Sequence, residues 1–212
     1  ITPEQKPGSA PEHQALKGLR MAAHCGAETE TKSVFGGDEA REVANSPLHI
    51  GICAGAEYGP AKRWPLDRYA EVIKLVSAER DGIEWQFFGA PGEKAMGEEL
   101  SKMVSAAHHN RVGKTSMPEL IAALKRCTLL VTNDTGTMHL AAALGVPTVS
   151  IFGSTEPILT GPLGEHHSIV RHHVPCSPCF KRECPFGHYD CMTGITPQRV
   201  ADEVLHRLAA QV

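Results

Sequence analysis

The chain has 212 residues, of which 42% are hydrophobic and 21% are charged, and its net charge is −3 with histidine neutral. This length allows one domain, or one domain with an extension, that buries a substantial core. The slightly acidic balance argues against a nucleic-acid partner. No apolar run approaches the roughly 20 residues that a membrane-spanning helix needs.

Residues 1–46 differ from the rest of the chain. The first eleven residues are polar and contain three prolines, a composition typical of a loose segment. Short helices are expected over residues 13–25 and between residues 37 and 46. We interpret the whole region as a linker or docking arm. The chain begins with Ile1 rather than Met, so we expect it to be a processed or truncated piece of a longer protein.

Residues 47–212 alternate between strand and helix patterns, and we expect them to form one domain. Short apolar runs predict strands at residues 48–53, 83–88, 129–132, 148–152 and 168–171. Apolar residues at helical spacing predict helices at residues 65–78, 93–104, 118–126 and 136–144, with a last helix opened by Thr196 and Pro197. This alternation predicts an α/β fold, a Rossmann-like parallel sheet with helices on both faces. Ligands of such sheets bind beyond the carboxyl ends of the strands.

Residues 131–147 carry the strongest functional signal. An apolar strand breaks at Asn133-Asp134-Thr135-Gly136, and an alanine-rich helix follows. The first backbone N–H groups of a helix have no partner within it, and they attract anions, phosphate above all. Asp134 or Thr135 can cap this helix, and Gly136 lets a ligand approach the backbone. The alternative interpretation is an ordinary helix start, since these residue types are common there.

Two further loops follow strands of the same sheet. In residues 55–65, Lys62 and Arg63 stand just before a helix N-terminus, where the helix dipole disfavours cations. An anion bound between these cations and the helix would explain why they stand there. The alternative is that both are solvated surface cations.

Glu93, which follows the second strand, can accept hydrogen bonds from ribose hydroxyls. The alternative is that it is an ordinary acidic residue at the start of a helix. His139, on the first turn of its helix, either faces a ligand or packs against the protein with its hydrogen bonds made internally.

Four of the seven cysteines lie within sixteen residues, in an insert that covers residues 175–192. They are Cys176, Cys179, Cys184 and Cys191. This clustering predicts a structural cross-link (called a staple below) rather than a catalytic role. A Zn²⁺ site, two disulfides or an iron–sulfur site would each use four cysteines. The other three cysteines are expected to be free thiols in a reducing compartment.

Together these segments resemble glycosyltransferase family 9, the bacterial lipopolysaccharide heptosyltransferases, and within it the heptosyltransferase II branch. The resemblance extends over roughly residues 45–210. It rests on residues 53–65 (CAGAEYGPAKRWP), Phe88-Gly89, residues 132–143 (TNDTGTMHLAAA) and residues 195–200 (ITPQRV). The first and third segments are specific, whereas Phe-Gly alone is weak.

The resemblance implies a GT-B enzyme, in which two Rossmann-like domains face each other across a cleft. The carboxyl-terminal domain of such an enzyme binds ADP-heptose. The amino-terminal domain binds the lipopolysaccharide core acceptor and supplies the catalytic carboxylate. The chain resembles the carboxyl-terminal half with its connecting segment, so we expect the base to be absent and the isolated chain to be inactive. The implied location is the cytoplasm, at the inner face of the inner membrane.

The resemblance also implies roles for residues at the diphosphate of the donor. Lys62 is implied to contact the diphosphate and to stabilise it as the leaving group. Thr135 and Gly136 are implied to offer backbone N–H groups to the phosphates. Asp134 is implied to shape that turn, and His139 to lie near the phosphates.

For the rest of the donor, Glu93 is implied to hold the ribose, and Thr115 to Met117 to border the adenine. The reaction is then an inverting transfer in which charge builds up on the leaving β-phosphate. The sequence has no Asp-x-Asp motif, so we expect no divalent metal or other cofactor. Two alternatives stay open: a transferase that uses another nucleotide sugar, and a non-catalytic nucleotide-binding module.

Overall fold

The computed structural model describes residues 12–26 and 47–210. Within these ranges, six parallel strands form one sheet. The strands are β1 (Leu48–Cys53), β2 (Ile83–Phe87), β3 (His108–Asn110), β4 (Leu129–Asn133), β5 (Thr148–Phe152) and β6 (His167–Arg171). They lie in the order β3-β2-β1-β4-β5-β6, which is the doubly wound order of Rossmann folds. The order reverses between β1 and β4, so a ligand site is expected beyond the ends of these two strands.

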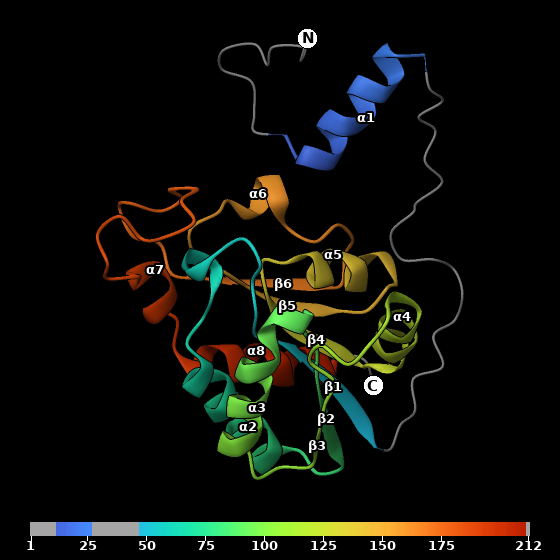
Figure 1. Ribbon diagram of the computed structural model, residues 1–212, viewed down its shortest axis with the longest axis vertical. Coiled ribbons are helices and arrows are strands. Elements are labelled where there is room, and N and C mark those ends of the chain that lie inside the picture. Colours follow the sequence, from blue (N-terminus) through green and yellow to red (C-terminus); the bar gives the residue numbers. More distant parts are fainter. Residues whose placement is uncertain (1–11, 27–46, 211–212) are drawn as a thin grey trace.

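Helices cover both faces of the sheet (Figure 1). One face carries α2 (Leu66–Glu79), α3 (Lys94–Met103) and α8 (Pro197–Ala209), with α2 in contact with the other two. The opposite face carries α4 (Met117–Arg126) and α5 (Gly136–Ala143). The shorter helical turns are η1 (Pro60–Lys62), η2 (Pro91–Glu93), α6 (Pro157–Thr160) and α7 (Asp190–Thr193). This arrangement confirms the α/β fold predicted from the sequence.

Each face of the sheet has its own core, because side chains alternate along a strand. On β1, Ile50 and Ile52 belong to the core beneath α2, α3 and α8, which also contains both tryptophans. Cys53 belongs to the second core, with Leu124 of α4 and Leu130 of β4. Strands that are buried on both faces are apolar along most of their length. This is why short apolar runs located β1, β2, β4 and β5 in the sequence.

β3 and the short helices α6 and α7 were not predicted from the sequence. β3 is an edge strand of three polar residues, His108, His109 and Asn110, and none of them is buried. An edge strand can be polar, so it left no apolar run to detect. The structure therefore places a strand between two helices that were expected to follow each other directly. α6 and α7 have four residues each, which is too short for a periodic pattern.

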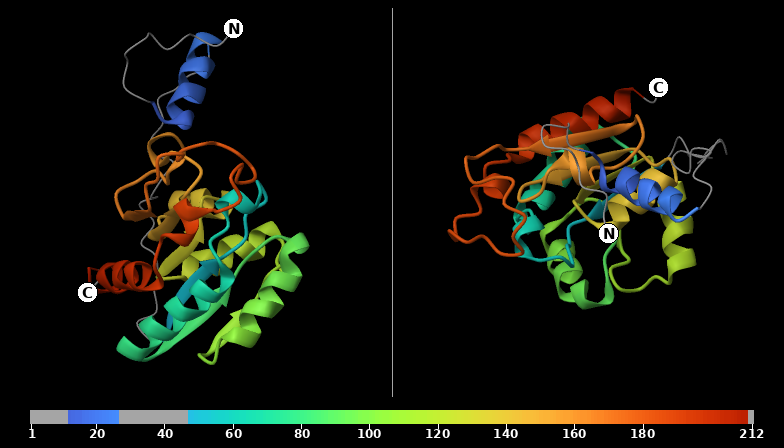
Figure 2. Two further views of the ribbon diagram at one scale, coloured as in Figure 1. Left: turned by 90° about the vertical axis from the view of Figure 1, so that its left-hand side faces the viewer. Right: turned by 90° about the horizontal axis from the view of Figure 1, so that it is seen from above.

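The helix α1 (Gln14–His24) matches the helix expected over residues 13–25. It lies beyond α6, outside the layers of the sheet (Figures 1 and 2). None of its residues is buried, and His13 at its start hydrogen-bonds the carbonyl of Gly161 at 3.0 Å. The expected loose start and second helix of the arm fall outside the described residues, so the linker interpretation stays a prediction.

In the two described ranges, no helix is both long and apolar enough to cross a membrane.

One buried side chain, Asn133 at the end of β4, joins the loops at the point where the strand order reverses. Its amide nitrogen donates to the carbonyls of Ala54 (2.7 Å) and Gly55 (3.2 Å), in the loop after β1. Its amide oxygen accepts from the backbone N–H of Trp64 (3.3 Å) and from the hydroxyl of Tyr69 (2.8 Å). These four hydrogen bonds use the full bonding capacity of the amide. The loop between β1 and α2 is therefore fixed to the end of β4.

Replacement of Asn133 by alanine should destabilise the protein by about 2–4 kcal/mol, because it leaves several buried polar groups without partners. Tyr69→Phe is the matched control, since it removes a single hydrogen bond of the same junction and should cost about 1 kcal/mol. Urea denaturation followed by circular dichroism measures both losses. Equal losses for the two variants, or no loss for Asn133→Ala, would contradict this role of the amide.

Candidate functional site

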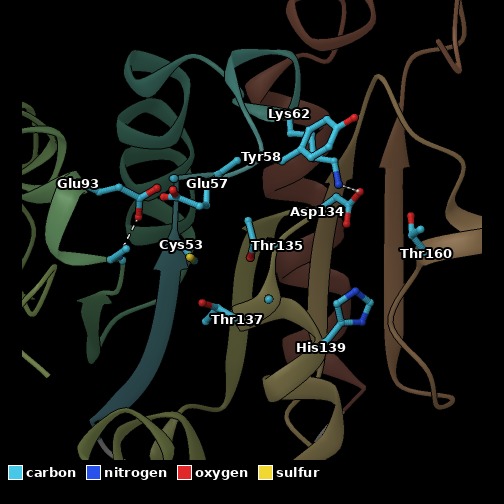
Figure 3. A pocket seen from close by; sticks show the side chains of 15 residues that line it. Cys53, Glu57, Tyr58, Lys62, Glu93, Asp134, Thr135, Thr137, His139 and Thr160 are labelled. Atoms are coloured by element: carbon cyan, nitrogen blue, oxygen red, sulfur yellow. Dashed lines mark hydrogen bonds and ion pairs between the residues drawn. The ribbon is translucent and has the colours of Figure 1, made fainter. Parts of the chain in front are cut away.

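A cavity of about 350 Å³ opens at the carboxyl ends of β1 and β4 (Figure 3). The loops after β1, β2 and β4 form it, together with one residue of α6. Its lining contains six of the seven predicted site residues, which are Lys62, Glu93, Asp134, Thr135, Gly136 and His139. The seventh, Thr115, does not line this cavity and lies half-exposed just before α4. Residues from three separate loops, singled out in the sequence, thus share one space.

The turn between β4 and α5 presents the start of a helix to the cavity. Thr135 is the N-cap residue, and its hydroxyl accepts a hydrogen bond from the backbone N–H of Met138 (3.4 Å). Among the described residues, nothing accepts a hydrogen bond from the backbone N–H groups of Gly136 and Thr137. Apart from its chain neighbours and its own helix backbone, no atom of residues 12–26 or 47–210 lies within 4 Å of the place where a Cβ on Gly136 would be. The helix start therefore has free donors and open space in front of them.

Lys62 and Asp134 form an ion pair beside this turn (Figure 3). Lys62 Nζ lies 2.6 Å from Asp134 Oδ2, and the two side chains are 13% and 5% exposed. Thr155 donates a hydrogen bond from Oγ1 to the same carboxylate oxygen at 2.7 Å. The ammonium has three N–H donors and uses one on Asp134, so within the described residues two remain for a ligand. Thr155 lies in the loop after β5, and no sequence motif pointed to it.

Glu93 lies across the cavity from this ion pair (Figure 3). Its Oε2 accepts a hydrogen bond from the backbone N–H of Ala90 (2.8 Å). The carboxylate lies directly against Gly55, where an added Cβ would overlap both of its oxygens. A Cβ on Gly89 would also come within 2.8 Å of Oε2. Both glycines are therefore needed for Glu93 to reach the cavity, which explains why a glycine closely follows β1 and another follows β2.

Two titratable side chains at the cavity are held in their neutral forms. Burial lowers the pKa of His139, the Asp134 carboxylate opposes this effect, and the nearby Lys62 ammonium adds to it. Burial raises the pKa of the Cys53 thiol, although hydrogen bonds from neighbouring threonines lower it. Both groups are therefore uncharged at neutral pH. The positive charge beside the turn comes from Lys62.

Several lining residues were not predicted from the sequence. They are Cys53, Gly55, Ala56, Glu57, Tyr58, Gly89, Ala90, Thr137 and Thr160. Most of them directly flank the predicted residues, so the motifs located the loops but not every side chain. Tyr58 makes a specific contact, because its ring centroid lies 4.8 Å from Lys62 Nζ. An aromatic residue in the same loop as a lysine was the signal that could have identified it.

None of the seven cysteines, all of which lie in the described residues, forms a disulfide in the structure. In the insert, burial raises the pKa of Cys191, and the nearby thiols of Cys179, Cys176 and Cys184 raise it further. Among the described residues, no three His, Cys, Asp or Glu side chains are grouped as they would be around a metal ion. A metal or disulfide staple therefore stays a prediction.

Comparison with known sequences agrees with the resemblance noted in the motifs. The family model for Glycosyltransferase family 9 (heptosyltransferase) matches residues 13–190. Lipopolysaccharide heptosyltransferase 2 of Salmonella typhimurium is 35% identical over 166 residues, which cover 76% of this chain and 47% of that protein. The Escherichia coli protein of the same name is 35% identical over 159 residues, which cover 73% of this chain and 45% of that protein. The chain thus spans about half the length of the curated relatives it matches.

Solved structures give the same result for the fold. The structure of the ADP-heptose lipopolysaccharide heptosyltransferase II of E. coli superposes with a TM-score of 0.67 at 27% identity, over 98% of this chain and 56% of that one. A family 9 glycosyl transferase from Veillonella parvula superposes with a TM-score of 0.78 at 25% identity, over 95% of this chain and 61% of that one. The family match covers most of the chain, and from it we conclude that the chain belongs to glycosyltransferase family 9, the heptosyltransferases.

Proposed function

We propose that this chain is the donor-binding half of an inverting heptosyltransferase and that its cavity binds the ADP part of ADP-heptose. The observation that carries the proposal is the Lys62 ammonium beside the open N-terminus of α5. The free N–H groups of Gly136 and Thr137 and the ammonium cation together suit a diphosphate. The likeness to the ADP-heptose enzyme of E. coli supports the choice of nucleotide sugar.

The charge balance of the site determines how a diphosphate would bind. Asp134 neutralises much of the Lys62 charge, so the ion pair alone attracts anions only weakly. Asp134 Oδ2 is already engaged by Lys62 and Thr155 before a ligand arrives. A diphosphate would therefore meet the helix N–H groups and the two remaining ammonium donors without displacing the carboxylate. In this proposal Asp134 holds Lys62 in place, and Lys62 contacts the ligand.

The same contacts would act on the transfer reaction. The acceptor hydroxyl attacks the anomeric carbon of the sugar, ADP leaves, and negative charge grows on the β-phosphate. Donors at that phosphate bind more strongly as the charge grows, so they lower the barrier. By analogy with oxyanion-hole donors, loss of Lys62 would slow the complete enzyme about 10²–10³-fold.

The acceptor side of the reaction is proposed to lie in the half of the relatives that this chain does not span. That half would supply the base and the site for the lipopolysaccharide core, at the inner face of the inner membrane. The chain alone would then bind the donor without transferring its sugar.

The four-cysteine insert is proposed to have a structural role, cross-linked either by a bound Zn²⁺ ion or by disulfides. Metal analysis of the purified protein distinguishes the zinc site from the disulfides.

For the nucleoside, we propose that Glu93 accepts hydrogen bonds from the ribose hydroxyls. Its Oε2 is bound to the N–H of Ala90, while Oε1 has no hydrogen-bond partner among the described residues. A free carboxylate oxygen in a cavity is a suitable acceptor for a sugar hydroxyl. Thr115 would border the adenine where the nucleotide extends beyond the cavity towards α4.

Lys62→Met should weaken ADP binding about tenfold to a hundredfold, because it removes a charge-assisted hydrogen bond to the diphosphate. It also leaves the Asp134 carboxylate without its cation. The double variant Lys62→Met/Asp134→Asn should therefore recover part of the loss. Isothermal titration calorimetry of the chain with ADP measures these changes.

Lys74→Met is the matched control for this experiment. Lys74 lies on α2, pairs with Glu71, is 75% exposed and does not line the cavity. Its replacement should leave the affinity for ADP unchanged. Equal binding of ADP by the wild type and Lys62→Met would contradict the diphosphate site. Equal binding of UDP and ADP by the wild type would contradict the choice of nucleotide.

Glu93→Ala should weaken ADP binding about tenfold, because it removes the acceptor of the ribose hydroxyls. The variant and the wild type should bind 2′,3′-dideoxy-ADP with similar affinity, since this nucleotide lacks those hydroxyls. Glu98→Ala, at an exposed position on α3, is the control and should behave as the wild type. The ribose assignment fails if Glu93→Ala weakens both nucleotides to the same extent.

A further inference from the structure

The Cys-rich insert contacts the loop that carries Lys62 through two hydrogen bonds. The hydroxyl of Tyr58 donates to the carbonyl of Phe180, which lies 122 residues further along the chain, at 2.9 Å. The backbone N–H of Ala61 donates to the carbonyl of Arg182 at 3.0 Å. The insert is itself fixed to the sheet, because the N–H of Phe180 donates to the carbonyl of Ser154 after β5 (2.8 Å). The loop after β1 is therefore attached to β5 through the insert.

Gly59 allows the loop and the insert to touch backbone to backbone. Its φ of 149° is a conformation that side-chain-bearing residues rarely adopt. A Cβ on Gly59 would lie only 2.6 Å from the carbonyl oxygen of Arg182. Any other residue at this position would push the Lys62 loop away from the insert.

The Tyr58 ring lies next to two cations. Lys62 Nζ is 4.8 Å from the ring centroid, and the guanidinium carbon of Arg182 is 5.5 Å from it. Both distances fall within the range of about 6 Å over which the face of an aromatic ring attracts cations. Tyr58 is 39% exposed, so it is not a core residue. In Figure 3 its ring lies across the Lys62 side chain at the cavity.

We propose that Tyr58 is a positioning residue for the Lys62 ammonium and that the insert segment 180–182 fixes Tyr58 in this position. The inference rests on the proposed function, in which Lys62 meets the donor diphosphate. A lysine side chain has many rotamers, and ordering it only when the ligand arrives weakens binding. Here the Tyr58 ring and the Asp134 carboxylate restrict the side chain beforehand. The insert thereby contributes to donor affinity through the loop.

Two substitutions of Tyr58 separate the ring from the hydroxyl. Tyr58→Leu removes both and should weaken ADP binding about threefold to fivefold. Tyr58→Phe keeps the ring, and the loop keeps its hydrogen bond from Ala61 to Arg182, so this variant should weaken ADP binding by less than about twofold. Adenosine lacks the phosphates that Lys62 would meet, so all three proteins should bind it equally. Equal weakening of ADP and adenosine would indicate a general disturbance of the loop and would overturn the proposal, as would wild-type affinity for ADP in Tyr58→Leu.

Two further variants test the part played by the insert. Gly59→Ala separates the loop from Arg182 and should reproduce the selective loss of ADP affinity seen for Tyr58→Leu. Phe186→Ala is the matched control, because Phe186 is 67% exposed on the same insert and stacks on His188. It should bind both probes as the wild type does. The role of the insert is refuted if Gly59→Ala binds ADP normally.

The position of Lys62 can also be measured without nucleotide. The ring current of Tyr58 should shift the NMR signals of the Lys62 side-chain methylenes in the free chain. This shift should persist in Tyr58→Phe and Phe186→Ala and disappear in Tyr58→Leu. Unchanged signals in Tyr58→Leu would overturn the proposal. A wild-type chain that binds no ADP would refute the proposed function instead, and the ring-current shift would still decide whether Tyr58 positions Lys62.

Discussion

The four hydrogen bonds of the Asn133 amide hold together the two loops on which the site depends. A parallel sheet brings the ends of β1 and β4 side by side, but it does not orient the loops beyond them. Asn133 does so, because it donates to the loop after β1 and accepts from Trp64 before α2 and from Tyr69 within α2. A buried amide with missing partners is unfavourable, so this arrangement of the loops is selected over others. Lys62 is consequently brought within 2.6 Å of Asp134, the residue next to Asn133.

The cavity combines two charges that would each be unfavourable alone. A lysine before a helix N-terminus is repelled by the helix dipole, and a nearly buried carboxylate loses its hydration. As an ion pair with an added hydrogen bond from Thr155, the two groups stabilise each other and leave little net charge. Affinity for a diphosphate would then come from arranged donors at a helix start rather than from a strongly positive surface. A donor site of this kind is compatible with a chain whose net charge is −3.

The sequence predicted those features that leave a local pattern. Apolar runs located the central strands, and apolar residues at helical spacing located α2, α3, α4 and α5. The turn at Asp134 and the loop at Lys62 were identified because their residue types are informative within a few positions. The contacts of Tyr58 with Phe180 and of Thr155 with Asp134 join distant segments, and no local pattern records them. The polar edge strand β3 was missed because it is too short and too exposed to need apolar residues.

The central claim is that a diphosphate binds at the start of α5. A titration of the ¹⁵N-labelled chain with ADP, followed through the backbone amide resonances, tests it most directly. The account predicts that the amide signals of Gly136 and Thr137 shift strongly as they donate hydrogen bonds to phosphate, and that they saturate together with binding. It would be contradicted if ADP bound to the chain while these two signals stayed in place and the largest shifts fell in another part of the protein.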